Sequence, residues 1–258
     1  MSGFHWTGVP RYARRMGYVS GQRRLAARGK RCRSQWRDHI LRCRELMVAA
    51  ANRCSDRGRV LVVGSGPLHD IPVAQLSARF REVILLDVVH LQGPRSEVKH
   101  YDNVRLVQGD VTGVAERVFL HRSLDVRPTR PWDSSFDLII SANVLSQLPL
   151  MPCQFVPASD GEKTSFAQRV VRSHLAWLAG AQGRVCLIAD VERQYWNGDV
   201  LQCAHPLLWG HTLPAGAEKW IWVLGPKPEM DPDYDIKHKV YAYVSFPKTE
   251  IDLNDIKL

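Results

Sequence analysis

Short apolar runs alternate with stretches of helical periodicity from residue 59 to about residue 189. Five of these runs have the length and composition of buried strands, and they cover residues 60–63, 83–86, 104–107, 136–140 and 184–189. The clearest helical stretches lie between them, over residues 71–80 and roughly 163–178. Strands that alternate with helices at this spacing predict a parallel sheet with helices on both faces.

The last part of the chain breaks this alternation. Residues 219–224 and 239–246 form two strand-like runs, and only a loop at 225–238 separates them. A connection without a crossover helix favours antiparallel pairing. The fold class that we predict is therefore α/β, with a doubly wound, mostly parallel seven-stranded sheet, an antiparallel final strand and an N-terminal helical extension.

The chain divides into a basic N-terminal region, residues 1–57, and an α/β domain, residues 58–258. Residues 34–54 repeat apolar side chains at helical spacing and predict an amphipathic helix, whereas residues 1–33 have no sustained period and are interpreted as a mobile arm or short helices. With 45% hydrophobic residues, the 258-residue chain can bury a sizeable core. No apolar run reaches the ~18 residues that a bilayer span needs, so we expect no transmembrane segment.

The formal net charge of +9 comes from one segment of the chain. Residues 1–50 contain twelve Lys and Arg but only the acids Asp38 and Glu45, whereas the other residues are close to neutral. Such a segment favours an anionic substrate or a polyanionic partner such as RNA or a membrane surface. A solvated basic arm with no nucleic-acid partner is an equally good interpretation.

The six cysteines form no CxxC motif and have no closely spaced histidine partners, so we predict no metal site. Cys32, Cys43 and Cys54 recur every eleven residues and are interpreted as small buried residues on a helix. The first residues lack the apolar core of a secretion signal, which predicts a cytoplasmic protein. Because residues 1–37 are basic and acid-free, import into an organelle stays open as an alternative.

The strongest local signal follows the first predicted strand, where Gly64 and Gly66 would let the backbone turn sharply beside a ligand. Asp87 ends the second strand, where a carboxylate can accept hydrogen bonds from ribose hydroxyls, and Asp110 ends the third. Each feature alone is also compatible with an ordinary turn or a helix cap. Together they predict a nucleoside site at the carboxyl edge of the sheet. His69 stands where a dinucleotide fingerprint needs its third glycine, and no P-loop motif is present.

Over roughly residues 58–246 the chain resembles the class I (Rossmann-like) S-adenosylmethionine-dependent methyltransferases. The segments VLVVGSGP, LLD, QGD and FDLIISANVLSQLP carry this resemblance. It implies S-adenosyl-L-methionine as the cofactor and the following contacts: Gly64, Ser65 and Gly66 with its methionine part, Asp87 with its ribose, Asp110 and Val111 with its adenine, and Ser141, Ala142 and Asn143 with the sulfonium and the substrate entrance.

The sequence departs from the family pattern at Val62, where an acid is common, and at Leu68, where a third glycine is usual. The first departure removes an anchor for the cofactor amino group, so Asp70 or backbone groups are expected to replace it. For catalysis we select Asn143 as an orienting amide and His205 or His211 as a base. Both histidines lie in a predicted substrate-side insert, residues 190–214. The favoured alternative is that its aromatic residues pack the insert onto the sheet and the histidines are ordinary polar residues.

The resemblance implies a methyltransferase whose methyl acceptor is unassigned, either an anionic small molecule or RNA bound through the basic arm. An alternative from another class is a non-catalytic, methyltransferase-like protein that binds nucleic acid or a protein partner through that arm. A dinucleotide-dependent oxidoreductase is disfavoured by His69 and by the closing pair of strands.

Overall fold

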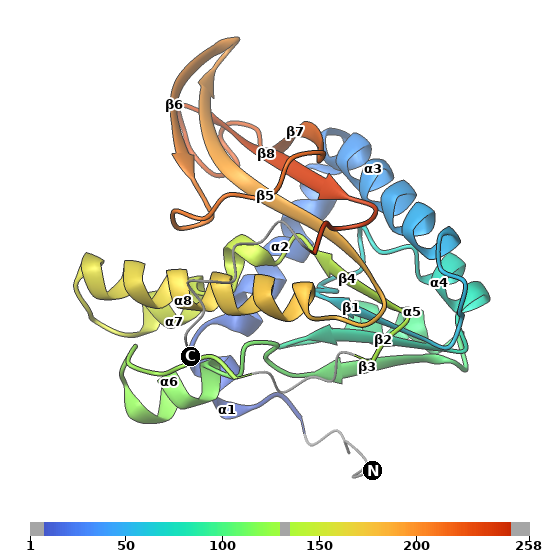
Figure 1. Ribbon diagram of the computed structural model, residues 1–258. Helices are drawn as coiled ribbons and strands as arrows, with labels where there is room; N and C mark the ends of the chain where they lie inside the picture. Colours follow the sequence, from blue (N-terminus) through green and yellow to red (C-terminus); the bar gives the residue numbers. More distant parts are fainter. Residues whose placement is uncertain (1–7, 130–134, 249–258) are drawn as a thin grey trace.

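The computed structural model describes residues 8–129 and 135–248, and it has one eight-stranded sheet (Figure 1). The strands run in the spatial order β3-β2-β1-β4-β5-β8-β7, with β6 pairing with β5 off this path. Their bounds are β1 (Arg59–Val63), β2 (Glu82–Asp87), β3 (Val104–Gln108), β4 (Leu138–Ala142), β5 (Arg184–Asn197), β6 (Val200–Pro206), β7 (Glu218–Gly225) and β8 (Asp235–Tyr243).

Strands β3, β2, β1, β4 and the first half of β5 are parallel, while β8 is antiparallel to both β5 and β7. The predicted fold class is therefore confirmed, including the antiparallel closing pair. The eighth strand was not predicted. It arises because β5 continues to Asn197, and a two-residue loop with Gly198 at a φ of 59° returns the chain as β6.

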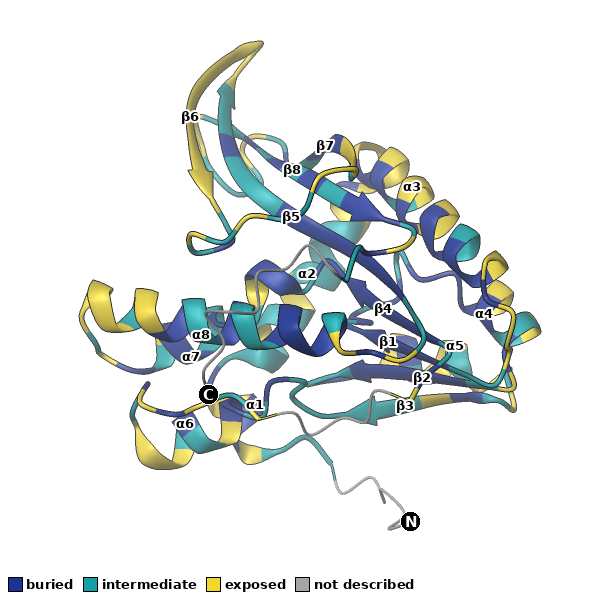
Figure 2. Cartoon of the chain, in the orientation of Figure 1, coloured by how far each residue is buried: buried dark blue, intermediate teal, exposed yellow. Residues whose placement is uncertain are grey.

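The helices cover both faces of the sheet and its carboxyl edge. Their bounds are α1 (Arg11–Arg15), α2 (Tyr18–Arg31), α3 (Arg33–Asn52), α4 (Val73–Arg79), α5 (Gln92–Val98), α6 (Ala115–His121), α7 (Leu150–Phe155) and α8 (Asp160–Ala179), with a short 3-10 turn, η1 (Leu145–Gln147). The buried side chains of α3 and α4 pack in one cluster with Val60 and Val62. Those of α8 pack with Leu61 and Val63 on the opposite face of the sheet. This alternation explains why both faces of β1 are buried (Figure 2).

The predicted arm is helical where it is described, because residues 8–31 contain α1 and α2, while residues 1–7 lie outside the described residues. Helix α1 is anchored by the buried Tyr12, Ala13 and Met16. Helix α2, in contrast, has no buried residue along its fourteen positions. Among the described helices, none is long and apolar enough to cross a membrane.

Candidate functional site

The glycine turn lies where the strand order changes direction. Strand β1 has β2 on one side and β4 on the other, and this switch point is where open α/β sheets bind ligands at their carboxyl edge. Gly64 has a φ of 78°, and a Cβ atom there would meet Val144 Cβ at 2.7 Å and the Ala142 carbonyl oxygen at 2.8 Å. Glycine is needed because the turn after β1 presses against the end of β4.

Asp87 joins this turn to the end of β2. Its Oδ2 accepts a hydrogen bond from the Gly66 amide at 2.8 Å, and its Oδ1 accepts one from the Gln22 side chain at 3.1 Å. Burial raises the pKa of the Asp87 carboxyl, whereas His90 and the backbone donors oppose this shift. Asp87 ends β2 as the sequence predicted, and its role in a ligand site stays a prediction. The sequence contained no signal for Gln22, which belongs to α2, 65 residues away along the chain.

Helix α2 crosses this edge with a small, polar inner face. Besides Gln22, this face includes Leu25, which packs against the core beneath α3, and Gly29, where a Cβ atom would lie 2.6 Å from His69 Nε2. These positions recur at helical spacing, so the neighbouring Arg23 and Arg24 point outward and are exposed. The apolar contacts of α2 are few and only partly buried, with Tyr18 and Val19 at its start and Leu25 further along.

Asp110 uses both carboxylate oxygens within its own loop. Oδ1 accepts hydrogen bonds from the Thr112 amide at 2.9 Å and hydroxyl at 2.7 Å, and Oδ2 accepts one from the Ala115 amide at 2.8 Å. Asp110 therefore holds its own loop against the first backbone amide of α6, whose N-cap position is Val114. Val111 lies on the same loop, after the end of β3.

The end of β4 contributes three of the predicted residues, which point to different surroundings. Ser141 is fully buried and its hydroxyl lies 3.0 Å from His174 Nε2 of α8. Ala142 contributes the carbonyl oxygen that approaches Gly64. Asn143 has a φ of 49°, a left-handed conformation that costs energy for a residue other than glycine and that asparagine tolerates best. Its side chain lies at the switch point.

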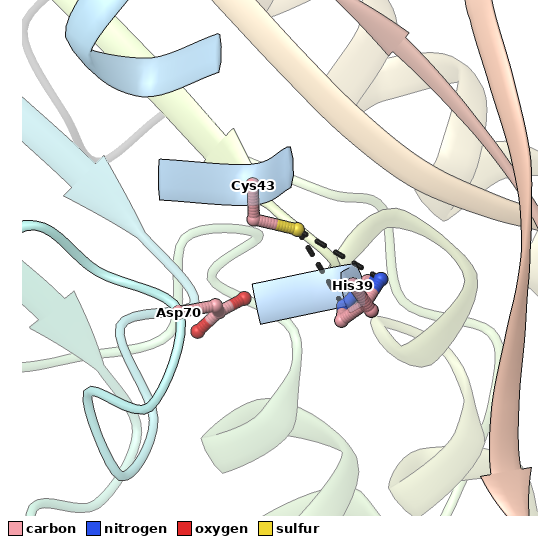
Figure 3. A group of neighbouring side chains, drawn as sticks. All are labelled: His39, Cys43 and Asp70. Carbon is pink, nitrogen blue, oxygen red and sulfur yellow. Dashed lines mark hydrogen bonds between the residues drawn. The ribbon is translucent and has the colours of Figure 1, made fainter. Parts of the chain in front are cut away.

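A buried polar cluster surrounds the Asn143 amide. Its Nδ2 donates to Asp70 Oδ2 at 2.8 Å and to Cys43 Sγ at 3.7 Å, and it lies 3.4 Å from His39 Nε2. Figure 3 shows His39 and Cys43 on α3, with Asp70 coming from the loop after the glycine turn. Asn143 Oδ1 is buried and has no hydrogen-bond partner among the described residues. The sequence suggested Asp70 and Asn143 but not the two residues from α3.

The ligand atoms of His39, Cys43 and Asp70 lie within 4.8 Å of one another, which raises the question of a metal ion. The indole nitrogen of Trp220 donates to His39 Nδ1 at 3.1 Å. Because an indole N–H can only donate, Nδ1 carries no proton, and the neutral imidazole carries it on Nε2, the nitrogen that lies 3.5 Å from Cys43 Sγ. A metal would need that nitrogen's lone pair, so the group as hydrogen-bonded does not fit a metal ion.

The structure does not bring the two predicted catalytic histidines together with Asn143. His205 is exposed on β6 and its ring packs edge-on against Tyr195. His211 Nε2 lies 3.0 Å from the Gln168 carbonyl oxygen of α8. In the described part of the chain, no hydrogen bond links either histidine to Asn143. Their surroundings agree with the alternative that they are ordinary polar residues of the insert.

A second buried polar group, formed by one histidine with an aspartate and a serine, lies beside the end of β4. His238 Nδ1 donates to Asp190 Oδ2 at 2.8 Å, and Ser146 donates to Asp190 Oδ1 at 2.9 Å. Arg193 Nε donates to His238 Nε2 at 3.1 Å, so both ring nitrogens of His238 have a hydrogen-bond partner. Sequence reasoning missed this group because its members come from η1, β5 and β8.

Burial lowers the pKa of His39 and of His174 to about 3 each. In the unfolded chain a histidine titrates near 6.5, so between these values the unfolded state binds protons that the folded state does not, and stability falls as the pH falls. We expect each histidine to account for about 2 kcal/mol of stability lost between pH 7 and pH 5. In urea unfolding at both pH values, His174→Gln should lose about 2 kcal/mol less stability between pH 7 and pH 5 than the parent chain. An unchanged loss would contradict the lowered pKa of His174.

No model of a known protein family matches the chain, and no curated protein sequence matches it. Among solved structures, the N-methyltransferase NodS from Bradyrhizobium japonicum WM9 in complex with S-adenosyl-L-homocysteine is 11% identical, over 81% of this chain and 87% of its own, with a TM-score of 0.42. The DhpI-SAM-HEP complex is 19% identical over 71% and 69%, with a TM-score of 0.38. The YcgJ protein from Bacillus subtilis is 22% identical over 58% of this chain, which spans 50% of that protein, with a TM-score of 0.33. The fold is assigned from the strand order of this chain. That order is the one expected from the resemblance to the Rossmann-like methyltransferases.

Proposed function

We propose that this protein is an S-adenosyl-L-methionine-dependent methyltransferase whose cofactor binds at the carboxyl edge of β1, β2 and β4. The observation that carries this proposal is the contact between Asp87 and the glycine turn. In this contact the Asp87 carboxylate lies 2.8 Å from the amide of Gly66, next to the switch point between β1 and β4, where it could accept hydrogen bonds from ribose hydroxyls.

The side chains at this edge fit a bound nucleoside cofactor. Ser65 Oγ and Asn143 Oδ1 are buried without a hydrogen-bond partner among the described residues, and a buried polar atom left so is costly. Ser65 lies in the glycine turn and Asn143 follows β4, so the two atoms flank the switch point. A ligand with donors and acceptors at this place would satisfy both.

When bound, S-adenosyl-L-methionine supplies an electrophilic methyl group on a sulfonium. The task of the chain is then to hold the acceptor atom in line with that group, about 3 Å away, and to exclude water. The backbone of Asn143 is held in place for such an orienting role. Its amide donates to the Ile188 carbonyl oxygen, and the Gln147 side chain donates to the Asn143 carbonyl oxygen. The exposed position of His205 gives it no comparable support.

Asp70 is the candidate partner for the cofactor's ammonium group. It lies after the glycine turn and is held by the Asn143 amide, while burial raises the pKa of its carboxyl. An approaching ammonium would favour the charged carboxylate. We expect Asp70→Ala to weaken S-adenosyl-L-methionine binding by roughly tenfold in calorimetry, the loss of one charge-assisted hydrogen bond. Equal affinity of the variant and the parent chain would exclude this role.

Gln22 occupies the Asp87 oxygen that a ribose hydroxyl would need, so cofactor entry requires it to let go. We expect Gln22→Ala to bind S-adenosyl-L-methionine about fivefold more tightly, because the cofactor no longer competes with a hydrogen bond of about 1 kcal/mol. Arg23→Ala, on the exposed face of the same helix, is the matched control. Weaker binding by Gln22→Ala would show instead that this amide contacts the cofactor.

For the acceptor, the charge distribution favours an anionic molecule, and RNA is the second candidate that it supports. Helices α1 and α2 cover the candidate site and carry exposed arginines on their outer faces. Five of these form no ion pair with a described residue: Arg11, Arg14, Arg15, Arg23 and Arg24. Positive charge at this place would raise the local concentration of an anionic acceptor.

The direct test of transfer uses S-adenosyl-L-methionine labelled on the methyl group, with total RNA and an anionic small-molecule fraction as separate acceptors. Label in either fraction, with equal release of S-adenosyl-L-homocysteine, is the expected result, and Asp87→Ala should abolish it. Cofactor binding without transfer into any fraction would favour the non-catalytic alternative.

A further inference from the structure

Strand β6 is an open edge of the sheet. It is antiparallel to the outer half of β5, and the hairpin that they form projects from the body of the molecule (Figure 1, top left). All seven residues of β6 are exposed, as Figure 2 shows along its length. Within the described residues β5 is its only strand neighbour, so the backbone groups along its other side have no strand partner.

Two features of this edge discourage pairing with other chains, Pro206 at the last position of β6 and a register shift in the β5–β6 pair between Tyr195 and Trp196. The other protective features are missing along the first six residues of β6. Charged side chains on an edge strand, and short edges, discourage such pairing. The edge strand β3 carries Arg105, and β7 begins with Glu218 and Lys219, whereas β6 has no charged residue among its seven. It also exposes two adjacent apolar side chains, Val200 at 60% and Leu201 at 44%.

We propose that β6 pairs with β6 of a second copy of this chain, in an antiparallel arrangement about a two-fold axis. A neutral strand can meet an identical strand without charge repulsion, even though each chain has a net charge of +9. The basic α1 lies at the opposite end of the molecule, which keeps that charge apart in such a pair (Figure 1). Because both copies use the same edge, the pairing closes as a dimer.

The symmetry of this pairing makes a specific prediction for Cys203. It is the middle residue of β6, so a two-fold axis centred on the strand places the two copies of Cys203 opposite each other. Opposite residues in antiparallel strands have Cα atoms about 4.5–5.5 Å apart, within the range that a disulfide spans. Cys203 is exposed and the other five cysteines are buried, so an added oxidant should act on Cys203 first.

The test is sedimentation velocity of the full chain from 2 to 200 μM under reducing conditions. A seven-residue strand pair buries less than a standard interface, so we expect a dimer with a dissociation constant on the order of micromolar. Leu201→Lys replaces an exposed apolar side chain of this edge with a charged one, a change that discourages strand pairing, and should weaken the dimer at least tenfold. Ile221→Lys is the matched control, since Ile221 is similarly exposed, at 47%, on β7. It should leave the dimer intact.

Diamide provides an independent readout, because it oxidises two thiols to one disulfide and accepts their two hydrogens. The parent chain should give a disulfide-linked dimer on a non-reducing gel, and Leu201→Lys should give much less. Cys203→Ser should form no covalent dimer yet still associate reversibly. A chain that stays monomeric up to 200 μM, or a dimer that Ile221→Lys disrupts and Leu201→Lys does not, would overturn the proposal. None of these results depends on cofactor binding.

Discussion

Replacing Asp87 with alanine is expected to reduce the affinity for S-adenosyl-L-methionine at least about 100-fold, because two ribose hydroxyls lose a charged acceptor, at about 1.5–3 kcal/mol for each hydrogen bond. The variant also removes the acceptor that holds the Gly66 amide at 2.8 Å, so the glycine turn loses its fixed conformation. Isothermal titration with S-adenosyl-L-methionine measures both effects together as a loss of affinity.

The same strand provides the control for this prediction. Glu82 begins β2, at the opposite edge of the sheet, and pairs with Arg59 at 3.1 Å. Glu82→Ala removes the same type of charge without touching the candidate site, so its affinity should equal that of the parent chain. An Asp87→Ala chain that folds and binds as tightly as the Glu82→Ala chain would exclude Asp87 from the cofactor site.

Replacing His238 with leucine is expected to destabilise the fold by about 3 kcal/mol, because it leaves the buried Asp190 carboxylate without its imidazole donor. Of the two side chains that donate to this carboxylate, His238 and Ser146, only Ser146 would remain. For a chain of this size the loss corresponds to a melting temperature lower by roughly 6–12 °C. Urea unfolding at pH 7 gives the free energy directly.

Two further variants separate a buried pair from a general effect of losing a histidine. His205→Leu, on the exposed β6, should change the free energy of unfolding by less than about 0.5 kcal/mol. Adding Asp190→Leu to His238→Leu should recover part of the loss, since the buried charge is then gone. If the double variant is less stable than His238→Leu alone, the contact between Asp190 and His238 is not the source of the destabilisation.

The sequence was sufficient to predict the parallel part of the sheet and its antiparallel closure. Strands buried on both faces are continuous apolar runs, as in β1 and β4, and their bounds could be placed within about two residues. Strand β6 has no such run because it is exposed on both faces, and its only local signal was the turn at Gly198. For residues 1–33 a mobile arm and short helices were both open, and α1 and α2 agree with the helices where this segment is described.

The candidate site shows the same division between local and long-range features. The glycine turn and Asp87 could be identified because each follows directly from the end of a strand. The contact of Asn143 with His39 joins residues 104 positions apart, and the contact of His238 with Asp190 joins residues 48 apart, and no periodicity reports such contacts. For Asp110 both a cap and a ligand role were open; it hydrogen-bonds to Thr112 and Ala115 of its own loop, and the ligand role stays a prediction.

The central claim is that the carboxyl edge of this sheet binds an adenosyl cofactor, and a calorimetric and thermal-shift titration tests it most directly. The ligands are S-adenosyl-L-methionine, S-adenosyl-L-homocysteine, NAD and NADP, each added to the full chain. The account predicts one binding site per chain for both adenosyl ligands, a raised melting temperature with each of them, and no effect of the dinucleotides. The account would be contradicted if both adenosyl ligands, at concentrations up to about 1 mM, gave no heat of binding and no rise in the melting temperature.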